Sequence, residues 1–344
     1  MGVCGLGRVP VIVSTMARIT EYDEGELIAQ FEQIFPKGER TILGIGDDCA
    51  QIATPEGSFI VTTDIIVEDE HFRRSWSDPE QIGARIAAQN LADIAGMGGR
   101  TSALVVTVAL TPDTELDWLL DLVRGVGERA REAGAGVVGG DLSRGETMVL
   151  SITAMGWCES EPVRRDGAKP GDILAFSGRL GLSNAGLDLL LGGHVDPALR
   201  TRAELGSLYE PLTTYRAPKP PLESGPAGAK AGARAMMDLS DGVAKDGGRM
   251  ARASKVVIEL DRRALEAEAA KLQEFADICK VDPLKWVLSG GEDHGILAAF
   301  PKDASLPQGF TPIGTLRAPQ EGEAPAQLLD GVEVKGGWDH FKTD

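Results

Sequence analysis

The acidic side chains of this 344-residue chain recur in short segments that also carry glycine or hydroxyl residues. Five such segments stand out, at residues 44–50, 62–64, 90–93, 139–141 and 238–242. Taken alone, each segment has an ordinary structural explanation, such as a helix cap or an Asx turn. Their recurrence in otherwise apolar surroundings is what calls for a common explanation.

A shared need for divalent cations explains the five segments together. Several half-buried carboxylates cannot all stay ionised without compensation, and few lysines or arginines adjoin them in the sequence. Mg²⁺ prefers a few carboxylates, waters and substrate phosphates as ligands. Because such ions neutralise charge on ATP and on a transferred phosphoryl group, the pattern predicts a site for several Mg²⁺ ions with ATP as co-substrate.

The common phosphate-binding and catalytic motifs are missing. The sequence has no GxxxxGK[ST] loop, no HRD or DFG kinase segment and no GxSxG elbow. A GxGxxG pattern does occur at residues 134–139, but an expected helix precedes it and an expected strand lies within it. A dinucleotide fingerprint requires the opposite order, so this pattern is weak evidence for a Rossmann site.

Composition narrows the class of protein. The net charge of −17 opposes binding to nucleic-acid phosphates, so we expect no nucleic-acid partner. The sequence lacks a run of 18 apolar residues, so we expect no membrane association. Its four cysteines are far apart and form no CxxC pair, which favours a cytoplasmic location.

Alternating helical and strand patterns predict two α/β domains divided near residue 158. We expect helices over 23–35, 79–97, 115–133 and 264–278, and strands over 59–67, 104–110 and 148–158, with a final strand region over 287–316. The predicted organisation is a disordered leader at 1–16, an N-terminal ATP- and Mg²⁺-binding and dimerisation domain at 17–158, and a C-terminal α/β domain at 159–344. Either Met1 or Met16 could be the true start.

The acidic segments also resemble, in order, the motifs of the thiamine-monophosphate kinases. The resemblance covers about residues 17–344 and lies in segments 44–50, 62–64, 71–72, 89–98, 139–141, 165–172, 238–242, 289–293 and 337–341. It implies the two-domain fold of the aminoimidazole-ribonucleotide synthetase superfamily, a mixed α/β fold. It also implies a homodimer whose N-terminal domains share a barrel-like interface, and direct transfer of phosphate from ATP to thiamine monophosphate.

The resemblance further implies a role for individual residues. Asp64, Asp93 and Asp141 would be catalytic, and the Mg²⁺ ligands would be Asp48, Thr62, Thr63, Asp64, Asp93, Asp141, Asp238 and Asp241. ATP would contact Gly140, Asp141, Arg165 and Ser240. Thiamine monophosphate would contact His71, Glu292 and Trp338. A flat aromatic ring such as that of Trp338 suits a thiazolium or pyrimidine ring, and a guanidinium suits a polyphosphate oxygen.

The chain departs from the family pattern at three places, all on the expected substrate side. These are the acidic pair Asp69 and Glu70, the pair His294 and Gly295, and Trp338. They leave open a protein of another class, a nucleotide sensor that has lost its acceptor pocket.

Other members of the superfamily fit less well. Selenophosphate synthetase needs a reactive cysteine with a nearby lysine, and Cys4 has no such lysine. The hydrogenase-maturation member ends in a functional cysteine, whereas this chain ends in Asp344. The purine-synthesis member lacks the Gly-Gly-Glu-Asp segment found here at 290–293.

Overall fold

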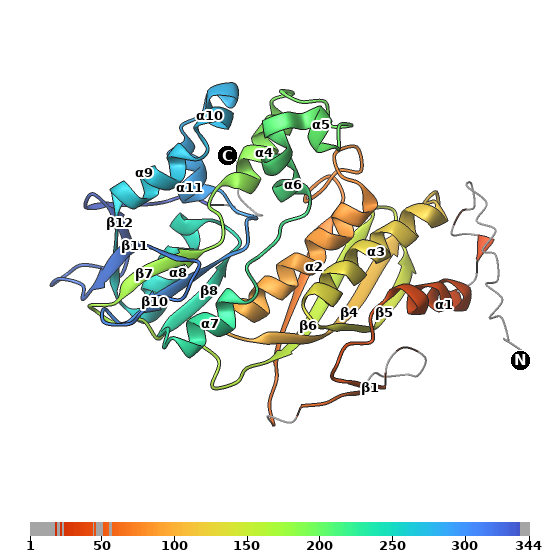
Figure 1. The fold of residues 1–344 in the computed structure, drawn as a ribbon, viewed down its shortest axis with the longest axis horizontal. Coiled ribbons are helices and arrows are strands. Elements are labelled where there is room, and N and C mark those ends of the chain that lie inside the picture. Colours follow the sequence, from red (N-terminus) through yellow and green to blue (C-terminus); the bar gives the residue numbers. More distant parts are fainter. Residues whose placement is uncertain are drawn as a thin grey trace, which may run out of the picture.

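The computed structural model describes residues 18, 21–22, 24–43, 45, 51–54 and 57–337. The described chain contains a four-stranded sheet, a seven-stranded sheet and a short two-stranded ribbon (Figure 1). The two larger sheets lie on either side of residue 158, and helices pack on both, as the expected α/β class requires. No helix in this part of the chain is long and apolar enough to cross a membrane.

The four-stranded sheet has the order β3-β6-β4-β5, with only β4 and β5 parallel. Its strands are β3 (Ile60–Val67), β4 (Arg100–Leu110), β5 (Gly136–Arg144) and β6 (Val149–Trp157). The helices of this half are α1 (Glu24–Ile34), α2 (Pro79–Gly96) and α3 (Leu116–Glu132), and the ribbon is β1 (Thr41–Leu43) with β2 (Gln51–Ile52). Helices α2 and α3 cover one face of the sheet (Figure 1).

The other face of this sheet, here called the open face, is covered by none of the helices in the described part of the chain. Strand alternation sends Thr62 and Asp64 of β3 toward α2, and sends Val61, Thr63 and Ile65 to the open face. Val61 and Ile65 are 59% and 55% exposed, which is unusual for large apolar side chains. Within residues 57–337, therefore, no helix or second sheet packs on the open face.

The seven-stranded sheet has the order β13-β12-β9-β11-β7-β10-β8. Its strands are β7 (Ile173–Ser177), β8 (Ala235–Leu239), β9 (Val257–Leu260), β10 (Gly295–Phe300), β11 (Phe310–Arg317), β12 (Gln327–Leu329) and β13 (Val332–Glu333). The helices are α4 (Leu182–Leu191), α5 (Arg202–Leu205), α6 (Tyr209–Arg216), α7 (Ser224–Lys230), α8 (Val243–Ser254), α9 (Arg262–Ala270), α10 (Gln273–Cys279) and α11 (Pro283–Ser289).

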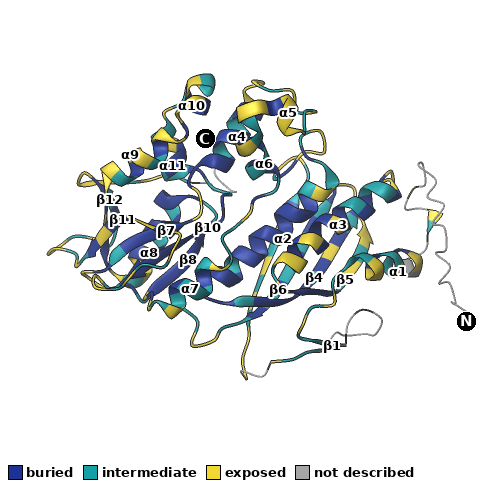
Figure 2. Ribbon diagram, viewed as in Figure 1, coloured by how far each residue is buried: buried dark blue, intermediate teal, exposed yellow. Residues whose placement is uncertain are grey.

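Helix α2 joins the two halves. It is buried along most of its length (Figure 2) because it packs on β3 and β6 on one side and on β8 on the other. A Cβ at Gly96 would lie 2.6 Å from the backbone nitrogen of Asp238, and one at Gly225 would lie 2.1 Å from the carbonyl oxygen of Ala95. Only glycine permits these approaches, so they set the distance between α2 and the C-terminal half.

Three sequence expectations need correction. The helix expected over 264–278 is two helices, α9 and α10, separated at residues 271–272. Residues 287–289 end helix α11 and belong to no strand. Residues 139–141, expected at the end of a short strand, lie inside β5, because parallel pairing with β4 continues to Arg144.

Candidate functional site

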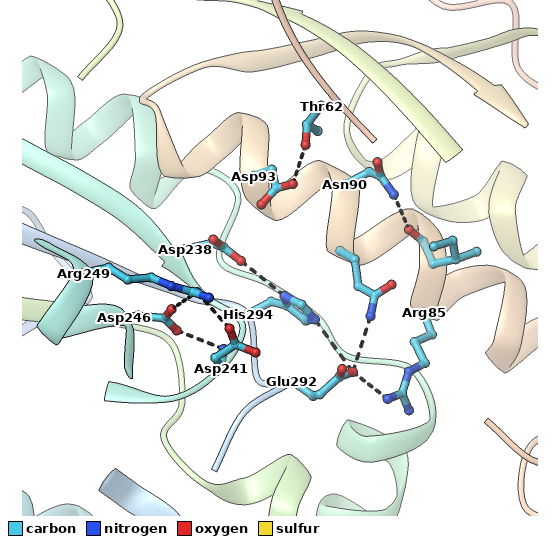
Figure 3. Close-up of polar contacts among 12 residues, drawn as sticks. Thr62, Arg85, Asn90, Asp93, Asp238, Asp241, Asp246, Arg249, Glu292 and His294 are labelled. Carbon is cyan, nitrogen blue, oxygen red and sulfur yellow. Dashed lines mark hydrogen bonds and ion pairs between the residues drawn. The ribbon is translucent and has the colours of Figure 1, made fainter. Parts of the chain in front are cut away.

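Three of the predicted carboxylates meet where the two halves of the chain join. Asp64 comes from β3, Asp93 from α2 and Asp238 from β8, and each contributes to the electrostatics of the others. Figure 3 shows Asp93 beside Thr62, whose hydroxyl donates to Asp93 Oδ2 at 2.6 Å. These residues, here called the carboxylate cluster, are brought together only by the packing of α2 against β8.

Like charge and burial disfavour ionisation of Asp64 and Asp93. Burial, followed by the charges of Asp238 and Asp64, raises the pKa of Asp93 from its ordinary 3.8 to about 8. Burial is also the largest cause that raises the pKa of Asp64, with Asp238 and Glu292 adding to it. In the described part of the chain, none of the three pairs with a lysine or arginine. The lack of basic partners inferred from the sequence therefore holds here.

Asp238 has an oxygen that the protein leaves unsatisfied. Its Oδ2 is buried without a hydrogen-bond partner, and His294 Nδ1 lies 3.5 Å away in poor alignment. Among the described residues, no group of three or more His, Cys, Asp or Glu side chains is arranged so that these side chains alone could hold a metal ion. An open set of carboxylates with an unsatisfied oxygen fits Mg²⁺, whose remaining ligands are usually waters and substrate phosphates.

A cavity of about 500 Å³ opens directly beside the cluster. Thr62, Asp93 and Asp238 line it, and so does the loop that carries Arg164, Arg165 and Asp166. The remaining lining includes Ile60, Ile94, Met97, Val163, Met236, Met237 and Ala253. A cavity that combines apolar side chains with carboxylates and arginines suits a nucleotide with its metal ions.

Asp241 does not share the environment of the cluster. Its Oδ2 lies 3.1 Å from Lys245 Nζ and 2.8 Å from an Arg249 nitrogen. Asp246 supports the same loop by accepting the backbone N–H of Asp241 at 2.9 Å, and burial raises the pKa of Asp246 to about 7 (Figure 3). The argument from missing basic partners is therefore wrong at Asp241, because helix α8 places two cations beside it, one and two turns further along the chain.

Glu292 and His71 lie on another side of the same site. Burial acts to raise the pKa of Glu292, but Arg85, His294 and His71 outweigh it and hold that pKa below its usual range. Ser240 is tied to this region by its backbone, since its carbonyl oxygen accepts the N–H of Glu292 at 2.9 Å. Two of the three predicted acceptor residues are thus brought together.

Five predicted residues, Thr63 among them, lie elsewhere or cannot be placed. Asp141 pairs in register with exposed Thr107 and faces the open side of the sheet, as Thr63 does, while Gly140 is exposed beside it. Asp48 and Trp338 lie outside the described residues. Gly337, however, packs against Asp241 and Lys245, so the described chain ends beside the site.

Sequence reasoning overlooked the residues that hold Glu292. Arg85 Nη2 donates to Glu292 Oε2 at 2.5 Å, and Gln89 Nε2 donates to the same oxygen at 3.4 Å. Arg85, Gln89 and Asp93 recur every four residues, so they share one face of α2. This spacing was available in the sequence, but nothing in it indicates which residue Arg85 would meet.

Comparisons with known proteins place the chain. Residues 46–158 match the family AIR synthase related protein, N-terminal domain. The thiamine-monophosphate kinase of Mycobacterium tuberculosis is 41% identical over 87% of this chain and 86% of its own length. The chain belongs to the thiamine-monophosphate kinase family. The family member of Corynebacterium glutamicum is 38% identical over 86% of this chain and 88% of its own length.

Solved structures agree with this family assignment. The structure of AaThiL complexed with AMPPCP and TMP matches with a TM-score of 0.73 and 30% identity, covering 95% of this chain and all of that one. The hydrogenase maturation protein HypE has the same fold at 19% identity and a TM-score of 0.64, covering 90% of this chain and 89% of its own. Both the family and the fold inferred from the sequence are confirmed.

The raised pKa of Asp93 makes the stability of the metal-free protein depend on pH. A carboxyl whose pKa is higher in the folded than in the unfolded state contributes stability below about pH 4, and this contribution is lost as the pH rises toward 8. An asparagine cannot ionise, so the Asp93→Asn variant does not lose this stability as the pH rises. At pH 8 in EDTA we therefore expect its free energy of unfolding to exceed that of the wild type by at least about 2 kcal/mol. Thermal unfolding from pH 4 to 8 measures the difference.

Asp303→Asn is the matched control, because Asp303 is exposed and far from the cluster in the chain. This control should follow the wild type at every pH. Equal pH dependence in the wild type and Asp93→Asn would contradict the account of the cluster.

Proposed function

We propose that this chain transfers the γ-phosphate of ATP directly to the phosphate of thiamine monophosphate, giving thiamine diphosphate. The carboxylate cluster beside the 500 Å³ cavity is the observation that carries the proposal. Buried carboxylates without a lysine or arginine partner are costly in a protein that binds no cation, and bound metal with polyphosphate offsets that cost. The acceptor, thiamine monophosphate, is inferred from the family to which the chain belongs. The composition fits a cytoplasmic enzyme that has no nucleic-acid partner.

The chain's own side chains would hold several Mg²⁺ ions at Asp64, Asp93 and Asp238, with Thr62 orienting Asp93. When bound, Mg²⁺ supplies charge neutralisation on the phosphates and on the transferred group. Asp48 is proposed as a further ligand from the family motif alone. Asp241 remains a proposed ligand for a further ion, although Lys245 and Arg249 already compensate its charge.

The remaining work is positioning. Arg165, on the loop that lines the cavity, would contact a phosphate oxygen, and so would Ser240, which lies at the turn between β8 and α8. His71 and Glu292, with Trp338 from the C-terminal segment, would hold the acceptor. Since a phosphate oxygen is already a competent nucleophile, no strong general base is required, and in-line alignment accounts for catalysis.

Release of ADP tests the function. With ATP and Mg²⁺, thiamine monophosphate should stimulate release by the wild type, while thiamine and aminoimidazole precursors should not. Asp64→Asn should reduce the stimulated rate by about a hundredfold or more, because it removes a charge that the metal requires. ADP release that no acceptor stimulates would instead identify a nucleotide sensor.

The open face supports a homodimer. Phe59, Val61 and Ile65 are each more than half exposed there, and two copies would cover them by closing their four-stranded sheets into one barrel. Asp141 lies on β5, at the opposite edge of the sheet from Asp64 on β3. If β5 of one copy adjoins β3 of the other, Asp141 comes to the β3 edge of its neighbour, and its proposed role as a catalytic and ATP-binding metal ligand, with Gly140 and Thr63, would be exercised across the interface.

Mixing two inactive variants tests this shared site. Asp64→Asn and Asp141→Asn homodimers should each be inactive. Co-expressed with different tags, they should form mixed dimers in which one of the two sites has both aspartates. Equal mixing should restore roughly a quarter of wild-type activity. Mixed dimers that remain as inactive as their parents would show that Asp141 acts within its own chain or not at all.

A further inference from the structure

Glu292 is held in an uncommon conformation. Its φ of 68° lies in the left-handed region, which non-glycine residues rarely adopt. The turn before it packs tightly on the loop after β8, since a Cβ at Gly291 would lie 2.3 Å from the carbonyl oxygen of Ser240. The backbone thus fixes where the Glu292 side chain begins, but a glutamate has enough rotatable bonds to point in several directions.

Arg85 determines where the carboxylate of Glu292 ends. The Arg85 side chain is only 4% exposed, whereas that of Glu292 is 33% exposed (Figure 3). Its Nη2 donates to Glu292 Oε2 at 2.5 Å, its Nη1 donates to the carbonyl oxygen of Tyr215 at 2.8 Å, and its guanidinium lies 4.9 Å from the centre of the Tyr215 ring. Arg85 on α2 is therefore fixed by α6 and in turn fixes Glu292.

Only one oxygen of Glu292 is used in these contacts. Both Arg85 and Gln89 donate to Oε2, and no described residue donates a hydrogen bond to Oε1. A carboxylate held through one oxygen by a buried guanidinium presents the other in a defined direction and remains ionised. Such an oxygen is well suited to a cationic acceptor such as the thiazolium of thiamine monophosphate.

We propose that Arg85 is a positioning residue that aims the Glu292 carboxylate at the acceptor. The inference rests on the proposed function, and it assigns to helix α2 a part in recognising the acceptor. Arg85 itself touches neither substrate. Its effect is transmitted through Glu292, with Gln89 as a weaker second donor.

Steady-state kinetics of Arg85→Met tests this assignment. Loss of the charged hydrogen bond should raise the KM for thiamine monophosphate by about tenfold or more. The KM for ATP should change by less than about twofold, because Asp64, Asp93 and Asp238 remain in place. Arg85→Lys keeps the charge but cannot contact both Glu292 and the Tyr215 carbonyl oxygen. Its KM for thiamine monophosphate should therefore lie between those of Arg85→Met and the wild type.

Two further variants separate positioning from general damage. Arg129→Met removes another buried arginine, paired with Glu132 on α3, and should leave both KM values unchanged. In the Glu292→Gln background, Arg85→Met should raise the KM for thiamine monophosphate little further, because Arg85 acts through the Glu292 carboxylate, which is already absent.

The outcomes are distinct. If Arg85→Met proves too unstable to assay, the same comparison is made with Arg85→Lys. Equal rises in both KM values, or independent effects of Arg85 and Glu292 in the double variant, would overturn the inference while leaving the proposed function intact. Absence of acceptor-stimulated ADP release by the wild type would remove the proposed function, and the inference with it.

Discussion

The close approach of helix α2 to strand β8 is the contact on which the site depends. At Gly96 no side chain separates the helix from the backbone of Asp238, so Asp93, three residues earlier, comes beside the Asp238 carboxylate. A longer side chain at residue 96 would move the two halves apart. The fold thus places carboxylates close together at the junction of its two halves, which is unfavourable in the absence of cations. In the proposed function, bound cations compensate this negative charge.

One face of α2 carries side chains for both substrates of the proposed reaction. Asp93 serves the nucleotide and metal end, while Gln89 and Arg85 reach Glu292 at the acceptor end. Eight residues of helix separate Arg85 from Asp93, which is about 12 Å along the axis. His294 lies between these ends, 3.5 Å from an Asp238 oxygen and 4.0 Å from a Glu292 oxygen. A departure from the family pattern therefore lies at the centre of the site, where its side chain faces both groups.

The sequence predicted the parts of the site whose signals are local. Periodicity located α2 and β3, and the acidic segments led to Asp64, Asp93 and Asp238, because short motifs carry their own chemistry. It failed where the outcome depends on contacts between distant segments. The cations beside Asp241 come from the next helix, the partner of Arg85 lies 207 residues away, and the face on which Asp141 lies depends on the register of β5 with β4. Extension of β5 through residues 139–141 and the break between α9 and α10 likewise follow from tertiary packing, which overrides local preference.

The central claim is that a proton occupies the Asp93 carboxyl until metal and nucleotide replace it. Titration calorimetry with Mg²⁺ and a non-hydrolysable ATP analogue, repeated at pH 7 in buffers of different ionisation enthalpy, counts the protons released on binding. The account predicts a net release of about one proton, mainly from Asp93, which is lost in Asp93→Asn. Binding with no proton release, or with the same release in Asp93→Asn, would contradict it.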